Sequence, residues 1–188
     1  MKFLYFKTKN IIKDKISTIL EIISEAIDII KFHNDLNSLT IFYTYSSVSI
    51  DELANIMVSE LYEDISIYES LTYKDEKKLE EALKIVENIF NETYVKDNYV
   101  NNKTLLMVLR NKTDERIKKL VLNNYYNDQD MRYTIKTFLE YNQNVTIAAE
   151  SLYLHRNTLN QRLTKFEEAT SFNVKKFIDG YLIYNIIK

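Results

Sequence analysis

The sequence predicts an α+β protein that is mainly helical, with a small N-terminal α/β segment followed by an all-α helix-turn-helix domain. In residues 1–90, short runs of β-branched and aromatic residues alternate with stretches of helical periodicity. From residue 103 onward, every stretch has helical periodicity. The pattern changes within a polar, irregular stretch over 91–102, which we interpret as a linker. We therefore expect two domains, residues 1–100 and residues 101–188.

The N-terminal elements are predicted from the spacing of their apolar residues. We expect a short edge strand over residues 1–6 and one long helix over residues 10–31, where isoleucines recur every three or four positions. A turn over residues 33–38 then leads to a β-branched and aromatic strand over residues 39–45. The remaining predicted elements of this domain are a helix over 50–62, a strand over 65–73 and an amphipathic helix over 75–90.

The C-terminal domain is predicted to contain helices only. Their expected ranges are 104–109, 113–126, 131–141, 145–152, 156–168 and 177–187.

Composition excludes several classes of chemistry. The chain has no cysteine and a single glycine, which rules out disulfides, thiolate metal sites and a glycine-rich phosphate-binding loop. Hydrophobic residues make up 46% of the chain and charged residues 28%, as in soluble globular proteins, and no apolar run is long enough to cross a bilayer. The first residues meet Lys7 and Lys9 at once and show no small-residue cleavage site, so we expect no export signal. We therefore expect a cytoplasmic protein with no cofactor, no metal and no membrane contact.

Residues 145–166 have the spacing of a helix-turn-helix. The first helix of this motif needs a small residue where the second helix crosses it, and Ala149 provides one. In the second helix, Leu159 and Leu163 lie four residues apart and form a buried stripe with Phe166. The opposite face of the second helix is then free to enter the major groove of DNA.

The side chains on that opposite face are of types that contact DNA. Asn and Gln can form two hydrogen bonds with adenine, and Arg can bind guanine or a phosphate. The candidates on this face are Arg156, Asn157, Asn160, Gln161 and Thr164, and the flanking Arg162 and Lys165 suit phosphate contacts.

Asn144 is the expected N-cap of the first helix. Tyr153 stands in the turn, where many helix-turn-helix motifs have glycine.

The same residues resemble a known family. Asn144-Val145-Thr146-Ile147-Ala148-Ala149, followed by Leu154-His155-Arg156-Asn157-Thr158-Leu159 and Arg162-Leu163, is similar to the C-terminal helix-turn-helix of the PucR/CdaR transcriptional regulators. The resemblance covers residues 131–188 and extends more distantly to the Fis-type DNA-binding helix pair, which adds Thr158 to the DNA contacts. Members of the family often carry glycines where this chain has Asn142 and Gln143.

The resemblance implies a sequence-specific, DNA-binding transcriptional regulator that contacts the major groove with helix 156–168. His155 either contacts DNA or only caps that helix. We expect a homodimer on double-stranded DNA, with residues 10–31 and 177–187 as contact surfaces. Two other functions stay open: a sensor whose α/β segment binds a small-molecule effector, and a protein-interaction module whose helix-turn-helix no longer binds DNA. We do not expect an enzyme, because the sequence has no recognisable nucleophile–base pair.

Overall fold

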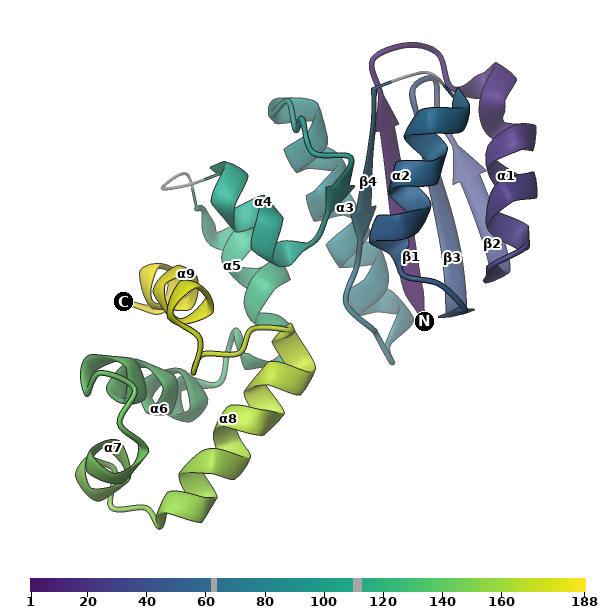
Figure 1. Ribbon diagram of the computed structural model, residues 1–188. Helices are drawn as coiled ribbons and strands as arrows, with labels where there is room; N and C mark the ends of the chain where they lie inside the picture. Colours follow the sequence, from purple (N-terminus) through teal and green to yellow (C-terminus); the bar gives the residue numbers. More distant parts are fainter. Residues whose placement is uncertain (62–63, 110–112) are drawn as a thin grey trace. The chain divides into compact units, whose positions relative to one another are not determined.

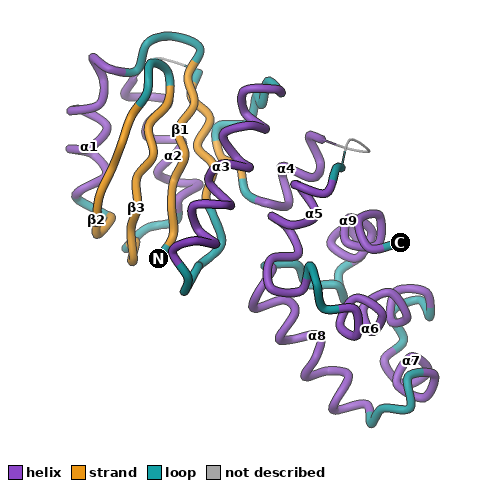
Figure 2. The backbone as a smooth tube through the Cα atoms, turned by 180° about the vertical axis from the view of Figure 1, so that it is seen from behind, coloured by secondary structure: helices purple, strands orange, loops and turns teal. Residues whose placement is uncertain are grey.

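The computed structural model describes residues 1–61, 64–109 and 113–188, which form two compact units, Met1–Asn101 and Asn102–Lys188 (Figure 1). Within these residues, the first unit holds a five-stranded sheet with helices, and the second unit holds helices only (Figure 2). The mainly helical α+β class predicted from the sequence is therefore confirmed.

The first strand, β1 (Lys2–Thr8), lies in the middle of the sheet, so its prediction as an edge strand was wrong. Phe3, Leu4, Tyr5 and Phe6 are all buried. An unbroken apolar run of this kind requires cover on both faces of the sheet, and β1 also pairs with β3 along one edge and with β4 along the other. The strand order is β2-β3-β1-β4-β5, with β2 (Ile27–Asn34), β3 (Ser38–Ser46), β4 (Ile65–Glu69) and β5 (Tyr99–Val100).

The long helix predicted over residues 10–31 was also wrong. The segment instead contains a 3-10 turn, η1 (Lys13–Lys15), then α1 (Ile16–Ser24) and the edge strand β2. Both α1 and β2 bury isoleucines in the same core, so burial alone does not distinguish the two structures. The β-branched run from Ile27 onward pairs with β3, and this pairing decides in favour of a strand.

The other N-terminal elements follow the sequence more closely. The helix predicted over 50–62 is α2 (Ile50–Leu61), and Tyr62 lies outside the described residues. The amphipathic helix is α3 (Glu76–Glu92). The predicted linker over 91–102 begins inside α3 and includes β5, which pairs in parallel with β4. Sequence periodicity does not indicate so short a strand.

Helices cover both faces of the sheet (Figures 1 and 2). Leu4 and Phe6 of β1 share a core with Ile19 of α1 and Leu53 of α2. On the other face, the ring of Tyr5 meets Phe90 of α3 edge to face, with 5.5 Å between ring centroids.

The second unit contains the helices that the sequence predicted, with small shifts at their ends. They are α4 (Asn102–Leu109), α5 (Glu115–Leu122) with the 3-10 turn η2 (Asn123–Tyr125), α6 (Gln129–Glu140), α7 (Val145–Ser151), α8 (Arg156–Thr170) and α9 (Phe177–Ile187). Among the described helices, none has both the length and the apolar character needed to cross a membrane.

Candidate nucleic-acid interface

Helices α7 and α8 form the predicted helix-turn-helix. Asn144 caps α7, since its Oδ1 accepts hydrogen bonds from the backbone N–H groups of Thr146 (3.1 Å) and Ile147 (3.2 Å). Ala148 and Ala149 are buried, so their small side chains allow the neighbouring helices to pack closely against α7. The predicted cap is observed, and the burial of the small Ala149 is consistent with the helix crossing predicted there.

The turn between α7 and α8 is left-handed at Tyr153, which has a φ of 54°. Glycine adopts this conformation without strain, whereas other residues meet a steric clash at Cβ. The backbone N–H of Leu154 bonds to the carbonyl of Ala149 at 2.8 Å, and this bond helps to hold the turn. The Tyr153 side chain is 97% exposed, so it contributes almost nothing to packing.

His155 begins α8 as its N-cap. Its Nδ1 accepts a hydrogen bond from the backbone N–H of Asn157 at 3.2 Å. The ring is exposed, and a DNA contact by His155 stays a prediction.

One stripe of α8 fixes the helix to the rest of the unit. Leu159, Leu163 and Phe166 are buried, as the sequence predicted, and Phe166 stacks on Tyr125 with 5.5 Å between ring centroids. Because this stripe is anchored, the opposite face of α8 is held in a constant orientation relative to α6 and α7.

Most of the predicted DNA-contacting residues lie exposed on α8 or at its start. The exposed ones are His155, Arg156, Asn157, Thr158, Gln161, Thr164 and Lys165.

Arg162 and Asn160 differ from the other candidates, because both are half-buried and bonded within the protein. The Arg162 Nη1 donates to the hydroxyl of the buried Thr134 on α6 at 2.8 Å. The Asn160 Oδ1 accepts a hydrogen bond from the ammonium of Lys175 at 2.9 Å. Arg162 therefore ties α8 to α6, and the structure adds Lys175 to the candidate surface.

Lys175 lies in the loop between α8 and α9, and sequence reasoning missed it. The adjacent pair Lys175-Lys176 was the only signal that could have indicated it. The loop is held in place by Asp179, a buried residue of α9 whose Oδ2 accepts from the Lys103 ammonium (2.7 Å) and from the backbone N–H of Asn173 (2.8 Å). Lys175 is thus presented to α8 from an anchored segment.

The charge on this surface suits a polyanion. From Arg156 to Lys165 the helix carries three cationic side chains and no carboxylate, and its first turn contains no acidic residue. The positive end of the helix dipole lies at the same end. The carboxylates Glu167 and Glu168 follow only in the C-terminal half of α8.

Among the described helices of the N-terminal unit, none has a comparable carboxylate-free run with basic side chains. Hollows are present in this unit. One, of about 270 Å³, includes Lys7, Lys9 and Tyr94 in its lining, and another, of about 370 Å³, includes Lys2 and Glu69. Within the described ranges, no group of three or more His, Asp or Glu residues is arranged to hold a metal ion.

Comparison with known proteins finds a family match within the C-terminal unit. Residues 131–184 match the family described as the PucR C-terminal helix-turn-helix domain. The resemblance stated from the sequence is therefore confirmed over this range.

Two further proteins are similar to longer stretches of the chain. The uncharacterized protein YxkF of Bacillus subtilis is 27% identical over 145 residues, which cover 73% of this chain and 49% of that protein. The chain thus spans about half the length of this relative. The second is a crystal structure described as a regulator of polyketide synthase expression from Bifidobacterium adolescentis. The alignment covers 99% of this chain and 77% of the chain in that structure, at 14% sequence identity and a TM-score of 0.43. That likeness is too loose to establish a common arrangement.

Proposed function

We propose that this protein, whose residues 131–184 form a PucR C-terminal helix-turn-helix domain, is a sequence-specific DNA-binding transcriptional regulator. In this proposal α8 enters the major groove, and the protein acts as a homodimer on double-stranded DNA in the cytoplasm.

The observation that supports the proposal is the division of α8 into two faces. Leu159 and Leu163 are buried, whereas Asn157, Gln161 and Lys165 on other sides of the helix are exposed. Amides can form hydrogen bonds with base edges, and an ammonium group can neutralise a phosphate. A helix that served only to pack in a bundle would also have a polar outer face, but it would not need that face to lack carboxylates.

The exposed side chains fall into two roles in the proposal. Asn157 and Gln161 contact base edges, because they lie four residues apart and hence on one side of the helix. Arg156 lies at the start of α8 and can reach a base or a phosphate, and Lys165 contacts a phosphate. Asn160 also contacts a base in this proposal; its Oδ1 accepts from the Lys175 ammonium at 2.9 Å, so the group it would offer to a base is the amide Nδ2 donor.

The test begins by selecting bound sequences from a random double-stranded DNA pool with the full chain. Binding of purified variants is then measured on the selected site and on a scrambled site. Gln161→Ala should weaken binding to the selected site by about 1–3 kcal/mol and change binding to the scrambled site little. Lys165→Ala should weaken both alike, because a phosphate contact is independent of sequence.

Leu159→Ala serves as the control for folding. It should lower the free energy of unfolding by about 2–5 kcal/mol, because the side chain is buried, and it should affect DNA binding only through unfolding. Circular dichroism separates this case from the surface variants. If Gln161→Ala and Arg156→Ala remain folded and bind both DNAs like the parent, α8 is not the recognition helix. If the parent selects no sequence at all, the interaction-module alternative is favoured.

A further inference from the structure

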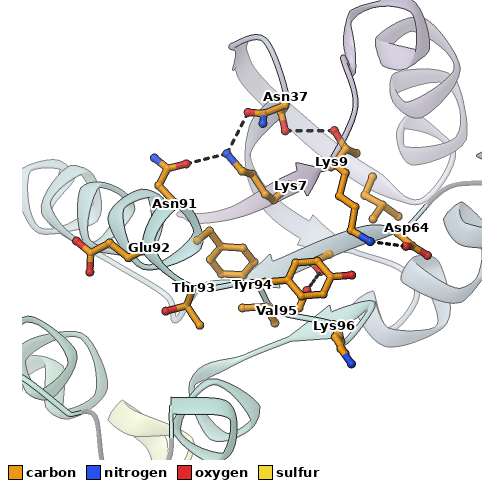
Figure 3. Close-up of a pocket in the computed structure, with 14 residues that line it drawn as sticks. Lys7, Lys9, Asn37, Asp64, Asn91, Glu92, Thr93, Tyr94, Val95 and Lys96 are labelled. Atoms are coloured by element: carbon orange, nitrogen blue, oxygen red, sulfur yellow. Dashed lines mark hydrogen bonds and ion pairs between the residues drawn. The ribbon is translucent and has the colours of Figure 1, made fainter.

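A hollow in the N-terminal unit, distinct from the helix-turn-helix, contains a lysine without a carboxylate hydrogen-bond partner. It lies where β1 ends, beside the segment that follows α3, and has a volume of about 270 Å³ (Figure 3). The side chains that matter here are Lys7, Lys9, Asn91 and Tyr94.

Lys7 is half-buried, and its ammonium is held by two neutral groups. It donates to Oδ1 of Asn91 at 2.7 Å and to Oδ1 of Asn37 at 3.0 Å (Figure 3). An ammonium has three N–H donors, so two bonds leave one donor for another acceptor. Burial lowers the pKa of Lys7 below that of an ordinary lysine, and the negative charge of Asp35 opposes this shift only in part. The positive charge of Lys7 is therefore incompletely compensated.

The neighbouring lysine is already satisfied and forms a wall of the hollow. Lys9 pairs with Asp64 at 3.0 Å and lies 4.7 Å from the centre of the Tyr94 ring (Figure 3). Together with Lys96, the lining contains three lysines against the two carboxylates of Asp64 and Glu92. A recess in which lysines outnumber the lining carboxylates, and in which a partly desolvated ammonium bonds to neutral amides, favours an anion over a cation or a neutral ligand.

We propose that this hollow is a binding site for a small oxyanion, either a carboxylate or a phosphate, which is free or forms part of a larger molecule. An oxygen of this group accepts a hydrogen bond from the third N–H of Lys7. The volume lies just below the range of about 300–1,000 Å³ found for sites of drug-sized ligands, so the ligand is a small metabolite. A pocket with a few convergent polar groups and a perturbed ionisable residue is the expected form of such a site. The proposal does not rest on DNA binding and is tested without DNA.

The test uses the full chain and two probe series, inorganic phosphate and the carboxylates acetate and malonate, each compared with chloride at equal ionic strength. The midpoint of thermal unfolding should rise with at least one probe, because a ligand that binds only the folded state stabilises it. The phosphate and carboxylate arms distinguish the two sources of the oxyanion. Titration calorimetry then gives the affinity of the probe that acts.

Lys7→Met should abolish the rise, and Lys74→Met, which removes an exposed lysine elsewhere in the same unit, should retain it. If Lys7→Met does not fold, Lys7→Gln removes the charge but keeps a hydrogen-bond donor and should also lose the response. In the parent, NMR signals of the Asn91 side-chain amide should shift and saturate as the probe is added. The proposal is overturned if no probe acts beyond chloride, if the Lys7 variant responds like the parent, or if the Asn91 signals do not move.

Discussion

Left-handed backbone positions in this protein are filled without glycine. Asn142, Gln143, Tyr153 and Ser171 all have φ between 53° and 64°. Asparagine accepts this conformation more readily than most residues, but tyrosine does not, and the cost at Tyr153 is about 1–2 kcal/mol. At Asn142 and Gln143, where the resemblance to the PucR/CdaR regulators implies glycine, the backbone has the left-handed conformation that glycine favours.

We expect Tyr153→Gly to leave the free energy of unfolding unchanged or to raise it by up to about 1 kcal/mol, because relief of strain is offset in part by the greater freedom of glycine in the unfolded chain. The side chain that is lost is 97% exposed. Urea unfolding measures the change. Tyr153→Ala is the matched control, because it also removes the ring but keeps Cβ, and it should show no gain. A clear loss of stability in the glycine variant alone would show that the left-handed strain is not significant.

At the scale of elements, the single glycine of the chain determines how α9 packs. A Cβ at Gly180 would lie 2.9 Å from Leu139 Cδ2, 3.1 Å from Gln143 Nε2 and 3.2 Å from the carbonyl oxygen of Val174. The last two atoms are hydrogen-bonded to each other at 2.7 Å. Glycine therefore allows α9 to approach α6 and the turn before α7, and this packing positions the loop that carries Lys175.

Gly180→Ala should lower the free energy of unfolding by about 1–3 kcal/mol, because the added methyl group overfills this contact. At a solvent-exposed position inside a helix, the same substitution would stabilise the protein by about 1 kcal/mol, so even the sign of the change in unfolding free energy is informative. Chemical denaturation measures it, with Tyr181→Ala at an exposed position of α9 as the control for helix propensity. A stabilised Gly180→Ala variant would contradict the close packing described for α9.

At the scale of the whole molecule, one recognition helix covers too few base pairs for high specificity. A dimer would place two such helices on half-sites about 34 Å apart or a multiple of that distance. Of the two surfaces expected from the sequence, residues 10–31 do not form a continuous helix. Four of their isoleucines are buried in the core of their own unit and three more pack partly against it. Helix α9, in contrast, exposes Phe177, Ile178 and Tyr181.

We therefore predict a homodimer in which α9 forms the contact. Light scattering should give twice the mass of one chain for the parent and for Tyr45→Ser, which removes an exposed tyrosine of the N-terminal unit. The double variant Phe177→Ser/Tyr181→Ser should be a monomer, because it removes the apolar surface that a partner would cover. A parent that is monomeric both alone and on DNA would contradict the prediction.

The salt dependence of DNA binding should reflect the small number of cations on each recognition surface. About three phosphate contacts per subunit give a dimer a slope near −5 in log K against log salt concentration. Fluorescence anisotropy over a salt series measures the slope. Lys165→Ala should make the slope less negative by about one for each phosphate contact that the variant loses. A slope near zero for the parent would mean that DNA is not the partner.

The sequence by itself determined the helix-turn-helix. Its signals are local: the Asn144 cap, the small Ala149 and the four-residue spacing of Leu159 and Leu163 all act within a short stretch of chain. Local hydrogen bonds and helical periodicity depend on neighbours in sequence, so they can be predicted without knowledge of the rest of the fold.

Only the tertiary structure decided the place of β1 in the sheet, the division of residues 10–31 between α1 and β2, and the partners of two candidate residues. Arg162 bonds to Thr134 and Asn160 to Lys175, which lie 28 and 15 positions away in the chain. An apolar run has the same sequence pattern whether it is covered on one face or on both, and an isoleucine-rich stretch can bury its side chains as a helix or as a strand. The distant segment that packs against each residue makes the choice, because burial and hydrogen bonding across the fold outweigh local preference.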